Sequence, residues 1–417
     1  MPFGTILDPI YASSSSSTII GYTRCGDSAL WTGAYLAAES FRYNVTQSAD
    51  ALKNVKTALA GIASLVNVTG DNRVARCIVV ANSPYAAGIA AEEAANTVTQ
   101  AAPWFWVGNT SRDEVVGVFF GLATAFDMVN DPDVKSTAAN LATLITGFVA
   151  HHQWSPNDSI SNTFQIRPEQ LQMLLVATNH MNPSSGISGP LLTLPISVGV
   201  MIDVLDLGSY FKFNLDHMTF YNLIRLEDNS SNRSAYQTIR NFTAGHQNPF
   251  FDLVDRGING SNAARDAETL ALLNEWLQRS KRDFTVDVTK TVGTCGSEAC
   301  APVPVAFRPP TDFLWQRDPF QLSGGGSGVV ESAGIDYILP YWMARYYGVL
   351  STDSTAQSSA AGVDAMAADS LASLYGSNLA VATALAGQQP LPTTLGGATV
   401  TVTDSKGVAR AAALTFA

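Results

Sequence analysis

Two adjacent acids, Asp113 and Glu114, follow Arg112 in the segment Thr-Ser-Arg-Asp-Glu, a few residues after Trp104 and Trp106. Hydrolysis of a glycosidic bond requires two carboxyl groups on opposite sides of the bond, roughly 5 Å apart for retention of configuration or roughly 6.5 to 9.5 Å apart for inversion. Neighbouring aromatic rings are what a sugar-binding cleft uses for stacking. The segment therefore predicts a carboxylate and aromatic site for carbohydrate chemistry.

The same acids also fit a purely structural role. Ser111 or Thr110 can cap a helix that begins here, and Asp113 or Glu114 then satisfies the first helical turn, as in a capping box. The sequence leaves the catalytic and the capping interpretations open.

Asp27 and Glu331 are the predicted partner acids. Asp27 stands at the start of a predicted helix, where it can equally be only the N-cap. Glu331 follows the glycine-rich segment Gly-Gly-Gly-Ser-Gly and precedes Asp336. In the predicted hydrolase, Asp113 or Glu114 acts together with Glu331 or Asp27 as acid and base.

Two histidines support a competing chemistry. A polysaccharide lyase neutralises a uronate carboxylate with Asn, Arg or His and removes a proton with a Tyr or His base, so Asn214, His217, Arg112, His246 and Tyr341 could form such a set. A histidine at the start of a helix can also be a structural hydrogen-bonding residue.

The substrate-binding prediction combines aromatic and polar residues. Arg112 and Asn214 are expected to orient hydroxyl groups or a carboxylate. The residues expected to line the cleft are Trp104, Trp106, Trp315 and Trp342.

Six polar clusters each lead into a run rich in apolar residues, which predicts six buried helices. The clusters are Arg24 to Asp27, Asn109 to Glu114, Arg167 to Gln170, Asn214 to His217, His246 to Pro249 and Glu331 to Asp336. The helices predicted from them cover 27–43, 111–129, 168–180, 215–227, 249–258 and 335–349. If these helices are parallel, their polar starts and their positive helix ends meet on one rim, which suits an enzyme pocket.

Amphipathic helices are predicted between the buried ones. They cover 48–65, 132–151, 190–207, 233–242 and 263–282, and an outer partner for the sixth buried helix is not evident. A long insertion at 67–108 contains a strand that starts at Cys77. Six inner and about five outer helices in alternation resemble the (α/α)6 toroid of carbohydrate-active enzymes over residues 20–350. The expected fold class is all-α, with an irregular helical bundle as the alternative.

After residue 350 the composition changes to Ala, Ser, Thr and Gly, and short strands with turns are expected. The segment Leu391-Pro-Thr-Thr-Leu-Gly-Gly and its surroundings resemble the opening strands of the immunoglobulin-like C-terminal module of exported acidobacterial proteins. The expected organisation is a catalytic toroid at 1–350 and a linker with a partial β module at 351–417.

Composition limits the partners of the chain. Its 417 residues are 46% hydrophobic and only 14% charged, and the net charge is -11. No Lys or Arg cluster is present to neutralise phosphates, so nucleic acid is not an expected partner. No apolar run of about 18 residues occurs, so no membrane insertion is expected. Oligomeric state is not predicted.

Cysteine usage and low charge point to an exported protein, and the resemblance of the C-terminal segment implies a bacterial origin. Cys295 and Cys300 are close enough for a local disulfide, and Cys25 and Cys77 are the candidate second pair. The start of the chain lacks a recognisable signal peptide, and removal of a leader is expected. The predicted location is outside the cell or on its surface.

The function expected first is a glycoside hydrolase. The alternatives are a polysaccharide lyase, a glycan-binding surface protein without catalysis, and a toroid dehydratase or isomerase acting on a small alcohol. Phosphate-loop, dinucleotide and zinc-helix motifs are absent, so no cofactor and no metal are expected.

Overall fold

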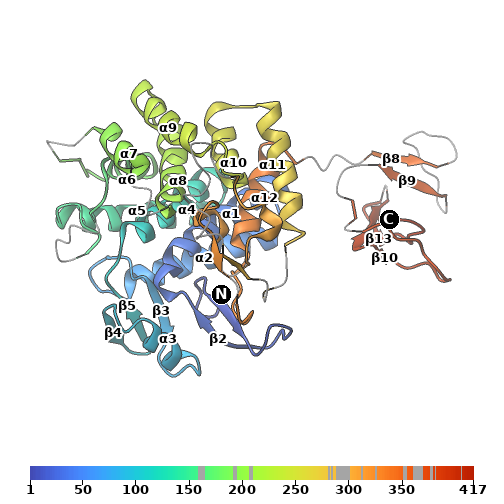
Figure 1. Ribbon diagram of the computed structural model, residues 1–417, viewed down its shortest axis with the longest axis horizontal. Helices are drawn as coiled ribbons and strands as arrows, with labels where there is room; N and C mark the ends of the chain where they lie inside the picture. Colours follow the sequence, from blue (N-terminus) through green and yellow to red (C-terminus); the bar gives the residue numbers. More distant parts are fainter. Residues whose placement is uncertain are drawn as a thin grey trace. The chain divides into compact units, whose positions relative to one another are not determined.

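The structure is a computed structural model of residues 1–417. It describes all of them except 158–164, 191–194, 206–209, 280–281, 283–284, 288–300, 311–312, 325, 351–354, 360–369, 376–378, 381 and 405. Contacts divide the chain into a helical unit, Met1–Val349, and a C-terminal unit, Leu350–Ala417. Both units are drawn in Figure 1.

The chain is mostly helical, as predicted. Six helices of the helical unit begin near the predicted polar clusters: α1 (Ser28–Thr46), α4 (Arg112–Met128), α6 (Pro168–Met181), α8 (Phe211–Leu226), α10 (Pro249–Asn259) and α12 (Ile335–Tyr346). The other helices are α2 (Ala49–Asn67), α3 (Ala86–Glu92), α5 (Pro132–His151), α7 (Ile196–Leu205), α9 (Ser230–Thr243) and α11 (Ala263–Trp276).

The six helices that begin near the polar clusters contact one another in a closed order. α1 packs against α4 and α12, α6 packs against α4 and α8, and α10 packs against α8 and α12. The remaining long helices each cover one or two of them, with α2 on α1, α5 on α4 and α6, α7 on α6, α9 on α8, and α11 on α10. In Figure 1, α1 and α4 lie in the middle of the helical unit, α7 and α9 lie towards its outside, and α12 lies beside α11.

Contacts at one end of these six helices show that they run in the same direction. Phe41 packs on Tyr221 and Tyr346, His180 and Arg225 bind Asp127, and Arg256 donates to the Tyr347 carbonyl. Each of these residues lies in or next to the C-terminal half of its helix. The polar N-terminal ends therefore lie on the opposite side of the helical unit.

Glycine allows α1 and α4 to approach closely. A Cβ atom at Gly33 would lie 2.0 Å from the carbonyl oxygen of Gly117, and a Cβ at Gly121 would lie 2.4 Å from that of Gly33. No side chain fits between the two backbones at these positions. The α1 and α4 helix starts are consequently held side by side.

Local sequence explains where several helices begin. Asp131 accepts hydrogen bonds from the first-turn amides of α5, and Pro132 occupies the first helical position. Asn248 and Pro249 do the same for α10. α8 is different, because it begins at Phe211 and not at the predicted residue 215. The polar cluster Asn214 to His217 was expected to precede this helix. It lies instead inside the helix, where these residues are buried.

A small sheet stands beside the starts of α1 and α4. It has the order β3 (Cys77–Val80), β5 (Trp104–Val107) and β4 (Val98–Ala101), all antiparallel. The predicted disulfide between Cys25 and Cys77 is confirmed, with Cα atoms 5.4 Å apart and 52 residues between them in sequence. The bridge fastens this sheet to the turn before α1. Cys295 and Cys300 lie outside the described residues.

Two further strand pairs belong to the helical unit. β1 (Asp8–Tyr11) pairs with β2 (Ile19–Thr23), and β6 (Val286–Asp287) pairs with β7 (Ser323–Gly324). The C-terminal unit contains β8 (Thr355–Ser358) with β9 (Ala372–Tyr375), β10 (Thr394–Leu395) with β11 (Ala398–Thr399), and β12 (Thr401–Thr403) with β13 (Ala409–Ala411). None of the described helices has the length and apolar content needed to cross a membrane.

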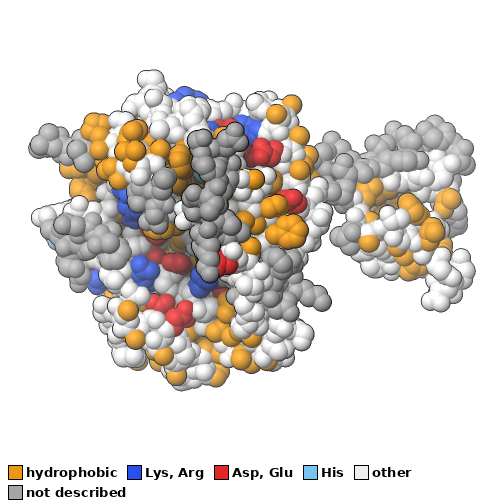
Figure 2. All heavy atoms as spheres, viewed as in Figure 1, with side chains coloured by type: hydrophobic (Ala, Val, Ile, Leu, Met, Phe, Trp, Pro, Cys, Tyr) orange, Lys and Arg blue, Asp and Glu red, His pale blue; other side chains and the backbone are white. Residues whose placement is uncertain are grey.

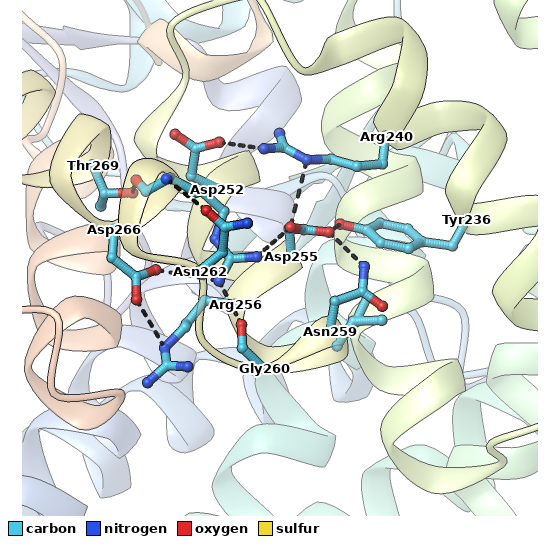
Figure 3. Close-up of polar contacts among 12 residues, drawn as sticks. Tyr236, Arg240, Asp252, Asp255, Arg256, Asn259, Gly260, Asn262, Asp266 and Thr269 are labelled. Carbon is cyan, nitrogen blue, oxygen red and sulfur yellow. Dashed lines mark hydrogen bonds and ion pairs between the residues drawn. The ribbon is translucent and has the colours of Figure 1, made fainter.

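A buried network of aspartates and arginines joins α9, α10 and α11 (Figure 3). Asp255 accepts from Tyr236 at 3.1 Å and from Asn259 at 2.7 Å, and it also receives the Arg265 guanidinium. Asp252 accepts from Arg240 at 2.8 Å. At its edge, Asp266 pairs with Arg265 at 3.2 Å and with Arg256 at 3.7 Å. We call these residues the aspartate–arginine network.

Candidate functional site

Glu114 is held at the start of α4 by a complete capping box. Its Oε2 atom accepts from the Ser111 backbone amide at 2.6 Å and from the Ser111 hydroxyl at 2.8 Å. Its Oε1 atom lies 3.3 Å from the Arg76 guanidinium. The side chain is fully buried. The structural role that the sequence left open for Glu114 is therefore realised, and the local contacts give the carboxylate little freedom to turn.

Asp113 points differently. Its side chain keeps 21% of its surface exposed and lies 3.9 Å from the Arg112 guanidinium. Burial raises the pKa of this carboxyl above its ordinary value, while the charges of Arg112 and Arg76 oppose the rise. Of the two adjacent acids, Asp113 is the one that remains in contact with solvent.

Arg76 connects the starts of α1 and α4. Its side chain donates to the Gly26 carbonyl at 2.7 Å and to the Asn109 carbonyl at 2.9 Å. Burial raises the pKa of Glu114 to about 8, Arg76 opposes the rise, and the charges of Asp113 and Asp27 add to it. Asp27 is the residue before α1, but its side chain makes no capping hydrogen bond. The structure thus brings Asp27, Asp113 and Glu114 together around Arg76.

A second group of acids lies beside the first, and none of its residues was predicted as a site residue. It consists of Glu169 of α6, Asp203 of α7 and Asp216 of α8, and we call it the carboxylate trio. Each acid offers an oxygen atom, and these atoms all lie within 4.8 Å of one another. All three side chains are buried, with exposures of 0%, 1% and 1%.

Arginines border the carboxylate trio. Arg167 lies 2.9 Å from Asp203, and the charges of Arg167 and Arg112 both lower the pKa values of Glu169 and Asp216. Burial acts more strongly in the other direction and raises the pKa of Glu169 to about 7. Burial and the neighbouring carboxylates also raise the pKa of Asp216 well above its ordinary value. Arg112 therefore acts on acids of both groups.

The signal for the carboxylate trio was present in the sequence but weak. Asp203 is an acid in the apolar segment Val-Met-Ile-Asp-Val-Leu, and Glu169 and Asp216 each belong to one of the six polar clusters. An acid on an apolar helix predicts a buried partner or ligand. The partner could not be named because it comes from another helix.

On the face drawn in Figure 2, acidic and basic side chains gather in a hollow of the helical unit.

The two histidines occupy apolar surroundings. His217 is fully buried, its Nδ1 atom contacts the Phe213 carbonyl at 2.6 Å, and its ring stacks on Phe251. His246 contacts the Tyr210 hydroxyl at 2.9 Å. Burial lowers the pKa of His217 to about 3 and that of His246 to about 4, so both rings are neutral near pH 7.

The predicted aromatic residues do not gather in one place. Trp106 is buried within β5 beneath Arg73, and Trp104 is half-buried on the same strand. Trp315 is fully buried and donates to the Asp336 carbonyl. Trp342 lies between Arg42 and Arg345, at the C-terminal side of the inner helices and away from the acids.

Three other predicted residues complete the survey. Tyr341 accepts from Arg345 at 3.2 Å, so it lies on the same C-terminal side as Trp342. Glu331 lies 3.6 Å from Arg282 and keeps 41% of its side chain exposed. Asn214 is fully buried in α8, and neither the nitrogen nor the oxygen atom of its side-chain amide has a hydrogen-bond partner among the residues that the structure describes.

Comparisons with known proteins assign no family. No protein-family profile, no curated protein and no solved structure matches this chain.

Proposed function

We propose that the helical unit is an (α/α)6 toroid and that the chain is a carbohydrate-active enzyme that hydrolyses a glycosidic bond. Six helices that contact one another in closed order, with their C-terminal ends together, support the toroid. The step from this architecture to carbohydrate chemistry is an analogy with enzymes of that shape. The acids at the N-terminal ends of α1 and α4 carry the functional part of the proposal.

Asp113 is the proposed general acid. A general acid must hold its proton near the working pH and must reach the substrate. Two observations favour Asp113 for this role: burial shifts its pKa upward, and its side chain remains partly exposed. Glu114 is a positioning residue, since the capping box and Arg76 already occupy both its oxygen atoms.

Asp27 is the proposed second carboxylate. Its charge acts on Glu114, so it lies near the start of α4, and the contacts of Arg76 hold the turn that carries it. Glu331 is bound to Arg282 instead, next to the β1–β2 pair. Arg112, between Asp113 and the carboxylate trio, is placed to orient a hydroxyl group or a carboxylate of the substrate.

A screen against neutral and acidic polysaccharides tests the proposal. Release of reducing ends without an unsaturated, ultraviolet-absorbing product would support hydrolysis. Asp113→Asn should then lower kcat by about 10²-fold or more, the usual contribution of general acid catalysis. Asp133→Asn is the matched control, because that acid is 86% exposed on α5.

Other outcomes would replace the proposal. Reducing ends together with an unsaturated product would indicate a lyase and redirect mutagenesis to His246 and its hydrogen-bonded neighbour Tyr210. Binding of a glycan without turnover would indicate a glycan-binding protein. Full activity of Asp113→Asn would remove Asp113 from the mechanism.

We also propose that the protein is exported and that residues 350–417 belong to an accessory β module. The buried Cys25–Cys77 disulfide supports an oxidising compartment. Fractionation of the source cells with an antibody against the helical unit tests this location, and recovery only from the reducing cytoplasm would contradict it.

A further inference from the structure

The carboxylate trio has acceptor atoms but almost no donors. Among the described residues, neither carboxylate oxygen of Glu169 and neither of Asp216 has a hydrogen-bond partner, although all four atoms are buried. Asp203 has the Arg167 guanidinium at 2.9 Å. A buried acceptor without a donor costs free energy, and a buried charge without a partner costs more. Within the part of the chain that the structure describes, no positively charged or donating group compensates Glu169 and Asp216 by direct contact.

The oxygen atoms are directed towards one another. Glu169 comes from α6, Asp203 from α7 and Asp216 from α8, yet one oxygen atom of each lies within 4.8 Å of the others. Coulomb repulsion alone would separate three such groups. Three helices that bring their carboxylates to one point need a compensating charge there.

The backbone of α7 leaves room for Glu169 at this point. A Cβ atom at Gly199 would lie 2.1 Å from the Oε2 atom of Glu169, so any side chain at this position would displace the carboxylate. The Gly199 carbonyl accepts from Arg167 at 3.3 Å. The absence of a Cβ at Gly199 thus leaves space for the Glu169 carboxylate against α7, and Arg167 contacts both the Gly199 carbonyl and Asp203.

We propose that Glu169, Asp203 and Asp216 bind a divalent cation of the calcium or magnesium type. Carboxylate oxygens are the ligands that these hard cations prefer, and neither a thiolate nor an imidazole belongs to the cluster. The carboxylate oxygen atoms of Glu169 and Asp216 would coordinate the cation, which would link the starts of α6 and α8 to α7. This inference does not depend on the proposed glycosidase activity.

Thermal unfolding of the whole chain with defined cations tests the site. The protein is first dialysed against EDTA and then against metal-free buffer. Calcium and magnesium are then titrated separately, while Tm is followed by circular dichroism and binding by calorimetry. A cation that binds only the folded state should raise Tm progressively with its concentration. Calorimetry should show one site per chain.

Two substitutions and one control locate the response. Glu169→Gln and Asp216→Asn should each weaken calcium binding at least tenfold. Neither should lower Tm in EDTA, because each removes an uncompensated buried charge. Asp133→Asn, at an exposed acid, should respond to calcium as the wild type does. Elemental analysis of the protein before dialysis gives an independent stoichiometry.

Two results would overturn the proposal. The first is a wild type that shows neither a Tm change nor binding heat with millimolar calcium or magnesium. In that case, protons shared between the carboxyl groups, and not a cation, would reduce the negative charge of the three acids. The second is an unchanged response in Glu169→Gln, which would place the cation elsewhere. The wild-type titration decides the first case even if a variant fails to fold.

Discussion

The aspartate–arginine network and the carboxylate trio each place three acids between helices, but they differ in what surrounds those acids. In the network, Asp252, Asp255 and Asp266 are met by three arginines, a tyrosine hydroxyl and an amide (Figure 3). In the trio, Arg167 pairs with Asp203, and the four carboxylate oxygen atoms of Glu169 and Asp216 have no hydrogen-bond partner among the described residues. Every acid of the network is thus paired with an arginine, whereas Glu169 and Asp216 have no such direct contact in the described part of the chain.

The difference separates two uses of buried charge. A compensated network specifies how helices pack, since each carboxylate fits a fixed set of donors. An uncompensated cluster leaves a position for something that is not part of the chain. Burial alone does not distinguish them, because it raises the pKa of Asp252 and that of Glu169 to about 7 alike.

Asp255→Ala should have the largest effect on stability. It removes the acceptor of Tyr236 and Asn259 and leaves the buried Arg265 guanidinium with less compensation. Breaking a buried ion pair by removing one partner costs about 3 to 5 kcal/mol, and a loss of that order is expected in urea unfolding. A loss below about 1 kcal/mol would mean that the network does not hold α9 to α11.

The second largest effect should be the change with pH in the free energy of unfolding that Glu169 of the trio causes. The folded-state pKa of Glu169 is raised from 4.5 to about 7, so the folded state binds its proton more tightly than the unfolded state does. Its contribution to stability is full below pH 4.5 and disappears as the pH rises through 7, a change of roughly 3 kcal/mol at most. In chelator, Glu169→Gln should remove this slope in unfolding measurements between these pH values.

Calcium sharpens the same measurement. A bound cation requires deprotonated ligands, so its stabilisation should grow with pH and oppose the slope that Glu169 causes. The slope due to Asp252, which Asp252→Asn reveals, should not respond to calcium. If calcium changed both slopes equally, the two clusters would not differ in the proposed way.

Gly199→Ala should act on the trio alone, with a smaller effect. The added methyl group would displace the Glu169 carboxylate, at a cost of about 1 to 3 kcal/mol typical of an overpacked core. Calcium should then no longer raise Tm. Gly147→Ala in α5 is the matched control, because its Cβ would meet only Ile187, at 4.0 Å, and its calcium response should be that of the wild type.

Asp266→Ala should have the smallest effect. Asp266 keeps 21% of its side chain exposed at the edge of the network, and Arg265 retains Asp255 without it. A change of at most about 1 kcal/mol in the free energy of unfolding is expected, as for partly exposed ion pairs. A loss of stability as large as that of Asp255→Ala would show that Asp266 contributes as much to the network as Asp255 does.

Helix positions were largely predictable because their signals are local. Asp131 and Pro132 mark the start of α5, and the apolar periodicity of the following residues gives its length, so predicted and observed bounds agree. The start of α8 was not predictable in the same way. Asn214 and Asp216 look like residues before a helix, but their neighbours α6 and α10 bury them inside one.

The acids at α1 and α4 were partly predictable, and the trio was not. Asp27, Asp113 and Glu114 stand at helix starts, so parallel helices were enough to bring them together. Asp203 lies near the C-terminal end of α7, and its contact with Glu169 and Asp216 depends on how α7 is rotated against α6. Rotation of one helix against another leaves no pattern within either helix.

The disulfide beside Asp27 also makes the candidate site accessible to kinetic study. Cys25 and Cys77 are both fully buried, so a thiol reagent reaches their sulfur atoms only when the turn before α1 separates from β3. Under conditions in which exchange is faster than reclosure, the rate of reduction equals the rate of this local opening. Measuring the reduction rate of the bridge would thus give the rate at which the turn before α1 separates from β3, next to the starts of α1 and α4.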